Sequence, residues 1–541
     1  MFKKTTTQSS LFEVVNYLPN ALPESDWCFM YSEQILPLID EELFRPFYSE
    51  THGRYNAPIK TMISLLIFMG TEKLTWRDME FLFPRRLDWL TATHTPIGEG
   101  YIDHTTLFKF YSRMEESDAT QTLFNDLTNR FIELCGTSVK KQRTDSFFIH
   151  GWLKTLSRYG LFKETIRSFL LALNKHKSGL YAQIASGLSK DYLKGEFDIT
   201  EKDHTKAQKM VTKMAHDLYK IKCAFENHKQ VQHYESFKTL CLVFSQQCEL
   251  QETSKEEYEI IIKEKPDKDC LSTPHNTDAR YTRKRDQKVT GDKGFVTETC
   301  DPLNNTQFIT DTSVTKSTEP DCKEQPNLLD RLGESKRKPE ELFGDAGFVN
   351  GETILDAEKK DVVLEGPTAG HSQLLDTYHS TDRNLDVSDF DVYIDTESDT
   401  MIIESCPCGN APIDQHRSEK TGKINAHFDV NTCNNCNEKE RCPVKIGSRT
   451  ATVTMNEADV IGARRHHKYM NDKEYRKKCS IRAGAEALVS EITGKHGMRR
   501  SRHKKRTRTK LQLIFAALAC NVKRFLRHGM NYGFMVPNFA N

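Results

Sequence analysis

Apolar residues recur three or four positions apart over most of the first 135 residues. The stretches IKTMISLLIFMG and WRDMEFLF show this spacing, which predicts amphipathic helices. Thr75 and Asp103 stand before two such stretches and predict helix N-caps, because their side chains accept hydrogen bonds from the first helical N–H groups. Pro84 predicts a helix end. We therefore expect a helical N-terminal domain over residues 1–135, of a kind that occurs both in DNA-binding modules and in ordinary helical proteins.

The pattern then changes. The stretch RTDSFFI carries β-branched and aromatic residues at the density of a short buried strand. A second helical stretch follows, in which Val211, Met214 and Leu218 share one side. Residues 250–290 are polar and predict linker or loop. We therefore expect residues 151–285 to be a helical insertion with a linker.

From residue 294 onward the apolar period becomes two. GFVTETCD and NTQFITDTSV flank the turn-like PLNN and predict a β-hairpin. NLLDRL predicts a helix, ELFGDAGF a strand running into a loop, and KKDVVLEG another strand. FDVYIDTESDTMIIESC predicts a second hairpin, INAHFDV and RTATVTM add strands, and the last 70 residues return to a helical period. The prediction is a mixed α/β sheet over residues 136–541, interrupted by residues 151–285 and by a β-rich, cysteine-containing insertion over residues 370–465.

Composition adds less than charge distribution. The 541 residues are 28% charged with a net charge of +1, which fits a soluble protein of several domains but indicates no partner. Locally, residues 495–510 hold nine Lys or Arg and no acid, so this segment can bind a polyanion. No signal peptide is visible, and the longest apolar runs fall short of the roughly 20 residues that span a bilayer. We therefore expect a cytoplasmic protein without a membrane partner.

In that compartment the 15 cysteines are expected to be free thiols or metal ligands. Cys433 and Cys436 have the two-residue gap that suits tetrahedral Zn²⁺, and Cys442 with either Cys406 or Cys408 could complete the set. The equally weighted alternative is a group of reduced structural thiols.

Three acids stand out. Asp145 lies in the strand-like RTDSFFI, Asp345 follows the strand-like ELF, and Glu486 lies in a helical stretch four positions after Arg482. Two strand-end aspartates and one helix glutamate can converge on two Mg²⁺ or Mn²⁺ ions about 4 Å apart, as phosphoryl transfer requires. The alternative is ordinary: turn-capping aspartates and a surface Arg482–Glu486 pair.

Four motifs together resemble those of the DDE transposases of bacterial insertion sequences, in particular the group named eleven-eighty-two, related to the Tyr-Arg-Glu-Lys signature group. They are QRTDSFFIHGWLKTLSRYGLFKETIRSFL, TPHNTDARYTRKRD with GDKGFVTETCD, LFGDAGFVNGETIL, and RAGAEALVSEITGKHGMRRSRHKKRTRTKLQLIFAALACNVKRFL. The resemblance spans nearly the whole chain, and the order and spacing of the motifs are more specific than any one of them.

The resemblance implies an RNase H-like core whose catalytic, Mg²⁺-binding triad is Asp145, Asp345 and Glu486, with Glu491 as the rival for the third acid. It also implies that Arg482 contacts DNA. The density of basic side chains after it predicts further phosphate contacts from Lys495, Arg499, Arg500, Arg502, Lys504, Lys505 and Arg506, and the alternative is a solvated basic loop. The chain departs from the family pattern at three positions. Cys479 stands where the signature Tyr is expected, Thr493 replaces the signature Lys with Lys495 two positions later, and Asp292 stands in GDK where GYK is usual.

The activity implied is metal-dependent cleavage at the ends of a mobile element and strand transfer into target DNA. Terminal inverted repeats and target DNA would be the partners, a homodimer on DNA the working form, and the bacterial nucleoid the location. The alternatives are an inactive, transposase-derived DNA-binding protein or repressor, and a nuclease on the same fold.

Overall fold

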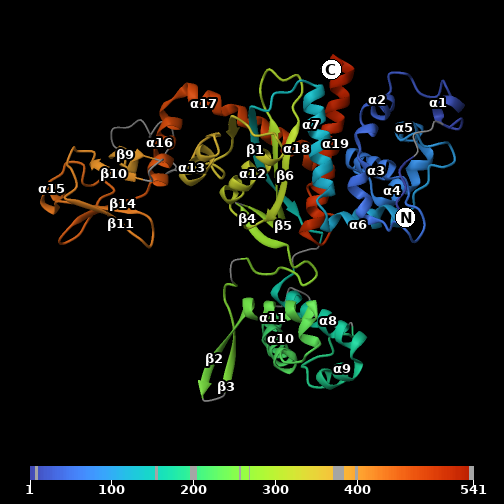
Figure 1. Cartoon of the computed structure of the whole chain (residues 1–541). Helices are drawn as coiled ribbons and strands as arrows, with labels where there is room; N and C mark the ends of the chain where they lie inside the picture. Colours follow the sequence, from blue (N-terminus) through green and yellow to red (C-terminus); the bar gives the residue numbers. More distant parts are fainter. Residues whose placement is uncertain are drawn as a thin grey trace.

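The structure is a computed structural model. It describes the whole chain except residues 6–9, 153–155, 195–203, 255–256, 267–268, 285, 369–382, 396–399 and 535–541. A central sheet lies between N-terminal helices on one side and a β-rich unit, which contains β9 to β14, on the other (Figure 1). A separate helical unit, which contains α8 to α11, lies beyond one end of the sheet (Figure 1). In the described part of the chain, no helix is both long and apolar enough to cross a lipid bilayer.

The N-terminal region is helical, as predicted. Its helices are α1 (Val14–Tyr17), α2 (Trp27–Gln34), α3 (Ile59–Glu72), α4 (Trp76–Leu82), α5 (Leu87–Ala92), α6 (His104–Arg113) and α7 (Ala119–Leu134), with 3₁₀ turns η1 (Leu36–Leu38), η2 (Glu41–Phe47), η3 (Phe83–Arg85) and η4 (Met114–Glu116). Both predicted caps are confirmed, since Thr75 forms a capping box with Asp78 and the Asp103 carboxylate accepts from two backbone N–H groups.

The central sheet has six strands, and β1 lies at its middle. They are β1 (Lys141–His150), β4 (Arg280–Lys284), β5 (Gln287–Thr299), β6 (Ile309–Lys316), β7 (Glu341–Phe343) and β8 (Val363–Glu365). The path runs β4-β5-β1-β7-β8, and β6 also pairs with β5. β5 is antiparallel to β1, whereas β7 and β8 are parallel to it. The predicted β5–β6 hairpin is confirmed.

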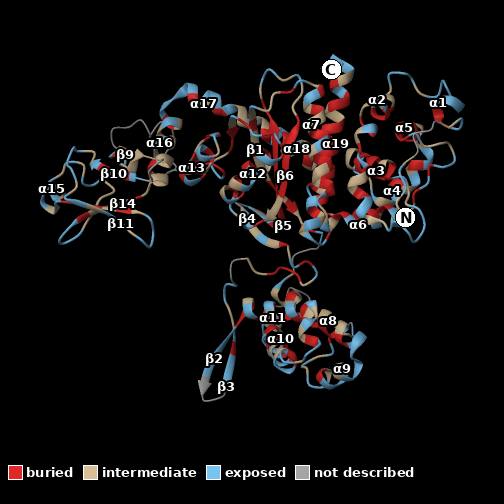
Figure 2. Ribbon diagram, viewed as in Figure 1, coloured by how far each residue is buried: buried red, intermediate tan, exposed pale blue. Residues whose placement is uncertain are grey.

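Helices cover both faces of this sheet. On one face lie α12 (Gln325–Glu334), which follows the 3₁₀ turn η6 (Asp321–Lys323), and α13 (Gly351–Lys359). Both helices bury their apolar sides against residues such as Phe295 and Leu342. On the other face, α7, α18 (Gly484–Gly494) and α19 (Arg506–Tyr532) share one core with the N-terminal helices and with Phe147 and Ile149 of β1. Buried residues are concentrated in the sheet and in α19 in Figure 2.

The helical unit that follows β1 has its own core. It contains α8 (Arg158–His176), α9 (Ser178–Ala185), α10 (His204–Phe225), η5 (Val231–His233) and α11 (Glu235–Gln247), which share a cluster of buried apolar residues. Residues 250–290 were predicted as linker or loop, and this was wrong for the first and last parts of the region, since its last part holds β4 and the start of β5. In its first part, β2 (Cys248–Ser254) and β3 (Glu257–Ile262) form an antiparallel hairpin. The hairpin is largely exposed, so its sequence lacks the apolar alternation of a buried strand.

The β-rich unit precedes α18. It contains η7 (Val387–Asp389), β9 (Asp391–Asp395), β10 (Thr400–Ser405), β11 (Asp414–Arg417), β12 (Ile424–Phe428), α15 (Val430–Asn434), β13 (Lys445–Ile446) and β14 (Ala451–Met455). The predicted β9–β10 hairpin is confirmed, although its turn lies outside the described residues, as does the predicted boundary at residue 370. The predicted boundary at residue 465 falls inside α16 (Glu457–Asn471), which leads through α17 (Lys473–Cys479) and η8 (Ser480–Ala483) to α18.

Candidate active site

The edge of β1 is open over part of its length. β7 pairs only with residues 141–143 of β1, and the far end of β1 is met at His150 by a bridge to Arg500. Between these points, no described strand pairs with this edge of β1. A groove of about 940 Å³ lies there, which we call the β1 groove. Its lining comes from β1, β4, β5, the loop after β6, α18 and the segment at Arg499.

Asp145 and Asp345 lie at the start of this open edge. The pairing of β1 with β7 ends at Arg143 and Phe343, and each aspartate stands two residues further along. Asp145 is therefore inside β1 and not at a strand end, as the sequence had suggested, but it lies where its parallel neighbour stops. Parallel strands in register bring equivalent positions side by side, so the two carboxylates converge.

The charge environment of Asp145 agrees with this placement. Burial raises the pKa of Asp145 to about 6, the backbone N–H of Ser146 opposes the rise, and the neighbouring Asp345 carboxylate adds to it. Arg482 lowers the pKa and Asp321 raises it. Asp145 thus sits among like charges that a single guanidinium does not balance, which is the setting in which a divalent cation stabilises a carboxylate.

The loop after Asp345 is held by that residue itself. Its Oδ1 accepts from the N–H groups of Gly347 at 2.8 Å and Phe348 at 3.2 Å. A β-carbon at Gly347 would lie 3.1 Å from both Asp345 Oδ1 and Asp321 Oδ2, so the glycine keeps the space between two carboxylates clear. Gly344 has another reason: a β-carbon there would be 2.9 Å from Cβ of Phe348 and would crowd the turn.

Glu486 lies in the first turn of α18, on the side that meets the β1 groove. Val489 and Thr493, three and seven positions later on the same helix face, line the groove. Glu486 is exposed and forms no hydrogen bond or ion pair within the described residues. Glu491 points elsewhere, because its Oε2 accepts from Arg524 of α19 at 2.7 Å. Of the two rival acids, Glu486 shares a helix face with the groove-lining Val489 and Thr493, although none of Asp145, Asp345 and Glu486 is itself among the residues that line the groove.

Sequence reasoning missed a second group of charges here. Asp321, in the turn after β6, accepts from Lys293 Nζ at 2.6 Å and from Ser146 Oγ at 2.9 Å. All three line the β1 groove, and the Lys293–Asp321 pair is buried. The sequence carries no local signal for this, because the three residues come from three separate segments.

The basic segment at 495–510 divides into two groups. Lys495, Arg499, Arg500 and Lys504 are exposed, and Arg499 lines the β1 groove. The other three predicted DNA contacts have protein partners: Arg502 donates to the carbonyl oxygens of Lys73 and Leu74, Lys505 pairs with Glu115, and Arg506 pairs with Asp292. Asp292, which departs from the family pattern, thus forms an ion pair within the protein with Arg506.

The other two departures lie in different settings. Cys479 is buried at the end of α17 and so cannot take the place of a DNA-contacting Tyr, whereas Thr493 lines the β1 groove.

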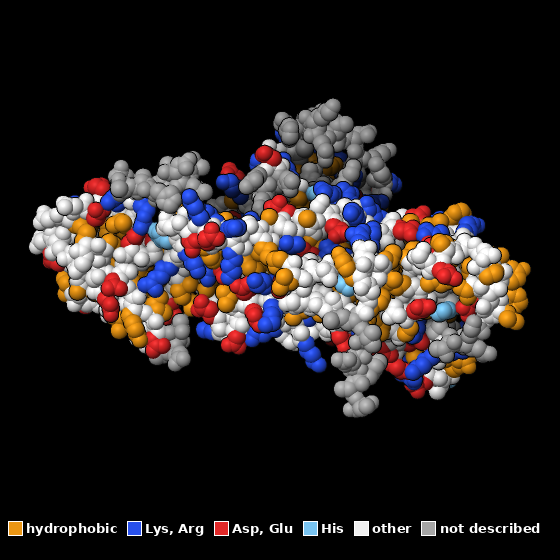
Figure 3. Space-filling view, turned by 90° about the horizontal axis from the view of Figure 1, so that it is seen from above, with side chains coloured by type: hydrophobic (Ala, Val, Ile, Leu, Met, Phe, Trp, Pro, Cys, Tyr) orange, Lys and Arg blue, Asp and Glu red, His pale blue; other side chains and the backbone are white. Residues whose placement is uncertain are grey.

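A further basic surface was not predicted. Lys473, Lys477 and Lys478 are exposed on α17. Seen from above, Lys and Arg side chains are frequent over the middle of the molecule, on the side where α17 and the end of α19 lie (Figures 1 and 3).

The predicted zinc residues gather in the β-rich unit. Cys408 Sγ lies 3.3 Å from Cys436 Sγ. Burial raises the pKa of Cys433, and Cys406, Cys442 and Cys436 add to the rise, so these four thiols are near one another. The five cysteines are therefore neighbours in the β-rich unit, and the structure does not favour Cys406 over Cys408.

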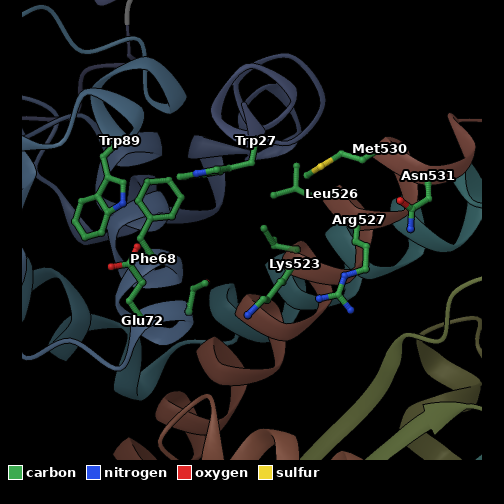
Figure 4. Close-up of a pocket in the computed structure, with 11 residues that line it drawn as sticks. Trp27, Phe68, Glu72, Trp89, Lys523, Leu526, Arg527, Met530 and Asn531 are labelled. Carbon is green, nitrogen blue, oxygen red and sulfur yellow. The ribbon is translucent and has the colours of Figure 1, made fainter. Parts of the chain in front are cut away.

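A second cavity, of about 330 Å³, lies between the N-terminal helices and α19 (Figure 4). Trp27, Phe68 and Trp89 form its aromatic wall, and Lys523 and Arg527 of α19 face them. It shares no lining residue with the β1 groove.

Comparison with known proteins gives two family matches. The family described as "Transposase domain (DUF772)" matches residues 29–113, from α2 to the end of α6. The family described as "Transposase DDE domain" matches residues 405–526, which include Arg482, Glu486 and the basic segment but neither Asp145 nor Asp345. No curated protein and no solved structure matches the chain. The two matches lie in separate parts of the chain, and they confirm its resemblance to the DDE transposases of bacterial insertion sequences.

Proposed function

We propose that this chain cuts DNA at the ends of its own insertion sequence and joins the freed ends to target DNA. One observation carries the proposal: Asp145 and Asp345 lie close together at the open edge of β1, next to the groove that α18 lines with Val489 and Thr493, and Glu486 stands on the same face of that helix. These acids would form the catalytic triad on an RNase H-like sheet. The order β6-β5-β1-β7-β8, with only the first two strands antiparallel to their inner neighbours, supports that assignment.

The residues present fit Mg²⁺ or Mn²⁺. Hard divalent ions prefer carboxylate oxygens, Asp145 lies among like charges, and Gly347 leaves room beside Asp345. When bound, the ions would activate the attacking oxygen and stabilise the leaving one. The protein's part is to position the DNA: Arg482 would hold a phosphate near Asp145, while Lys293 and Arg499 would line the path of the strand along the β1 groove.

The remaining partners follow from the reaction. The helices that match the transposase domain would bind the terminal inverted repeats, and the exposed group Lys495, Arg499, Arg500 and Lys504 would contact phosphates. Two element ends must be paired, so a homodimer on DNA is the proposed working form, in the cytoplasm at the nucleoid. The cysteine cluster would hold a structural Zn²⁺, which suits thiolate ligands.

The test is a cleavage assay on labelled DNA that carries the element ends, with Mg²⁺ or with EDTA. Wild-type protein should cut only with the metal ion, and Asp145→Asn, Asp345→Asn and Glu486→Gln should each bind the DNA but lose at least a hundredfold in cutting rate. Glu352→Gln is the matched control, because Glu352 is an exposed acid in the first turn of neighbouring α13. Cutting that survives EDTA or the triad substitutions would refute the triad. Specific binding of the ends without cutting in Mg²⁺ or Mn²⁺ would favour a repressor.

A further inference from the structure

Three side chains of types that can ligate a metal ion lie together in α18, the turn after it and α19, separate from the triad and from the cysteines of the β-rich unit. Glu491, His496 and Cys520 each offer a ligand atom, and these atoms lie within 4.8 Å of one another. His496 and Cys520 are 4% and 0% exposed. The ligand atoms of a tetrahedral ion with bonds of about 2.0–2.3 Å also lie within this limit of one another.

The imidazole of His496 is oriented for ligation. Its Nδ1 lies 3.1 Å from the carbonyl oxygen of Gly70 in α3, and because a carbonyl only accepts, Nδ1 must carry the proton. In the neutral ring Nε2 then carries the lone pair. Nε2 is buried and has no hydrogen-bond partner among the described residues. A ring fixed by a backbone carbonyl, with its other nitrogen free, is the usual arrangement of a metal-binding histidine.

The surrounding charges also suit a cation. Glu491 Oε2 accepts from Arg524, whose other terminal nitrogen lies 2.7 Å from Glu298 Oε2. Arg524 is thus shared between two acids. Glu298 also accepts from Arg143, so it does not offset the charge of an added ion. The Glu491 carboxylate and the Cys520 thiolate, once its proton is removed, together balance the two charges of a dication.

We propose that Glu491, His496 and Cys520 form a Zn²⁺ site. A thiolate, an imidazole and a carboxylate together select a borderline-soft ion over Mg²⁺. The ion would take a water molecule as its fourth ligand and would bind as the chain folds, because His496 and Cys520 are buried in the folded protein. It links α18, the turn after it, and α19, and through the Gly70 carbonyl it supports the packing of the N-terminal helices against α19.

Zinc content of the purified full-length protein tests the proposal. Cys520→Ser and His496→Gln should each lower the bound zinc by one equivalent, and the Co²⁺-substituted protein should lose thiolate-to-cobalt absorption in Cys520→Ser. Cys28→Ser is the matched control, because Cys28 is equally buried, at 0% exposed, but lies in α2 away from the cluster. It should keep the full zinc content. Cys433→Ser removes the separate zinc proposed for the β-rich unit, so the double variant Cys433→Ser/Cys520→Ser should lose two equivalents.

Equal zinc content in wild type, Cys520→Ser and His496→Gln would overturn the site, as would an equal loss in Cys28→Ser. Circular dichroism identifies a variant that fails to fold. If Cys520→Ser fails, His496→Gln decides the question, because its amide can still donate to the Gly70 carbonyl. If the wild-type protein binds zinc and the Cys433→Ser variant binds none, the site at His496 holds no zinc ion, and a buried water molecule would then contact His496 instead.

Discussion

The guanidinium group of Arg143 fills the space that a β-carbon at Gly484 would need. Arg143 lies in β1, two residues before Asp145, and Gly484 is the first residue of α18, two residues before Glu486. The same guanidinium donates to the carbonyl oxygen of Ile481 at 2.9 Å and to Glu298 Oε1. One contact thus sets the distance between the strand that carries the first acid and the helix that carries the third.

Gly484→Ala should therefore displace α18 and slow DNA cutting at least tenfold. The overlap with Arg143 should also lower the free energy of unfolding by about 1–3 kcal/mol. Gly494→Ala is the matched control in the same helix, because a β-carbon there meets nothing within 4 Å. Alanine at that position should leave cutting unchanged and stabilise the helix by up to about 1 kcal/mol. Chemical unfolding and the cleavage assay would measure both effects, and equal behaviour of the two variants would contradict the contact.

Two arginines of the basic segment should behave differently on substitution. Arg499 is exposed and lines the β1 groove, so Arg499→Ala should weaken DNA binding. The slope of the logarithm of the binding constant against the logarithm of salt concentration should fall by about 1, because one fewer counterion is released. Arg506 donates to the buried carboxylate of Asp292 at 2.9 Å, so Arg506→Ala should lower the free energy of unfolding by about 3 kcal/mol.

Binding titrations at several salt concentrations and urea unfolding would separate the two effects. A loss of stability in Arg499→Ala, with none in Arg506→Ala, would reverse the assignment.

Arg337 should be a strong determinant of stability. It is 2% exposed and donates to the carbonyl oxygen of Thr310 and to the side chains of Asn125 and Asn129, and burial lowers its pKa to about 10. Arg337→Met should cost roughly 3 kcal/mol, because buried acceptors lose their donor. Lys338→Met is the neighbouring control. Lys338 forms only an exposed pair with Asp361, worth about 0–1 kcal/mol. A cost below 1 kcal/mol for Arg337→Met would show that these acceptors find other donors.

His503 should make stability depend on pH. It is buried and stacked on Tyr111, and burial lowers its pKa to about 4, with Arg508 and Arg502 lowering it further and Glu115 opposing them. The unfolded histidine has a pKa of about 6.5. Between these values the unfolded chain binds a proton that the folded chain does not, so stability falls as the pH drops from about 6.5 to about 4.

Across this pH range the free energy of unfolding should fall by about 3 kcal/mol in total, because each unit of difference between the folded and unfolded pKa values is worth about 1.36 kcal/mol. Urea unfolding across this range would measure it, and His503→Gln should flatten the slope. An unchanged slope in that variant would assign the acid sensitivity to other groups.

The sequence by itself determined the local elements. Local interactions within a few residues set three of the predicted features: the capping of α4 by Thr75, the β5–β6 hairpin and the apolar side of α10. Such interactions can be predicted from the sequence, because they require particular residue types at short, regular spacings. The motifs also selected the resemblance that the two transposase matches confirm, and they singled out Asp145, Asp345 and Glu486 as candidate acids.

Only the tertiary structure decided which charged residues are engaged. Arg506 and Arg499 are alike in the sequence, yet one neutralises a buried aspartate and the other faces a groove. Asp321, Lys293 and Ser146 meet from three segments, and Cys520 of α19 lies near His496 of the turn after α18. The physical reason is that burial and pairing are set by contacts between residues distant in the chain, which leave no periodic trace in either partner's own segment.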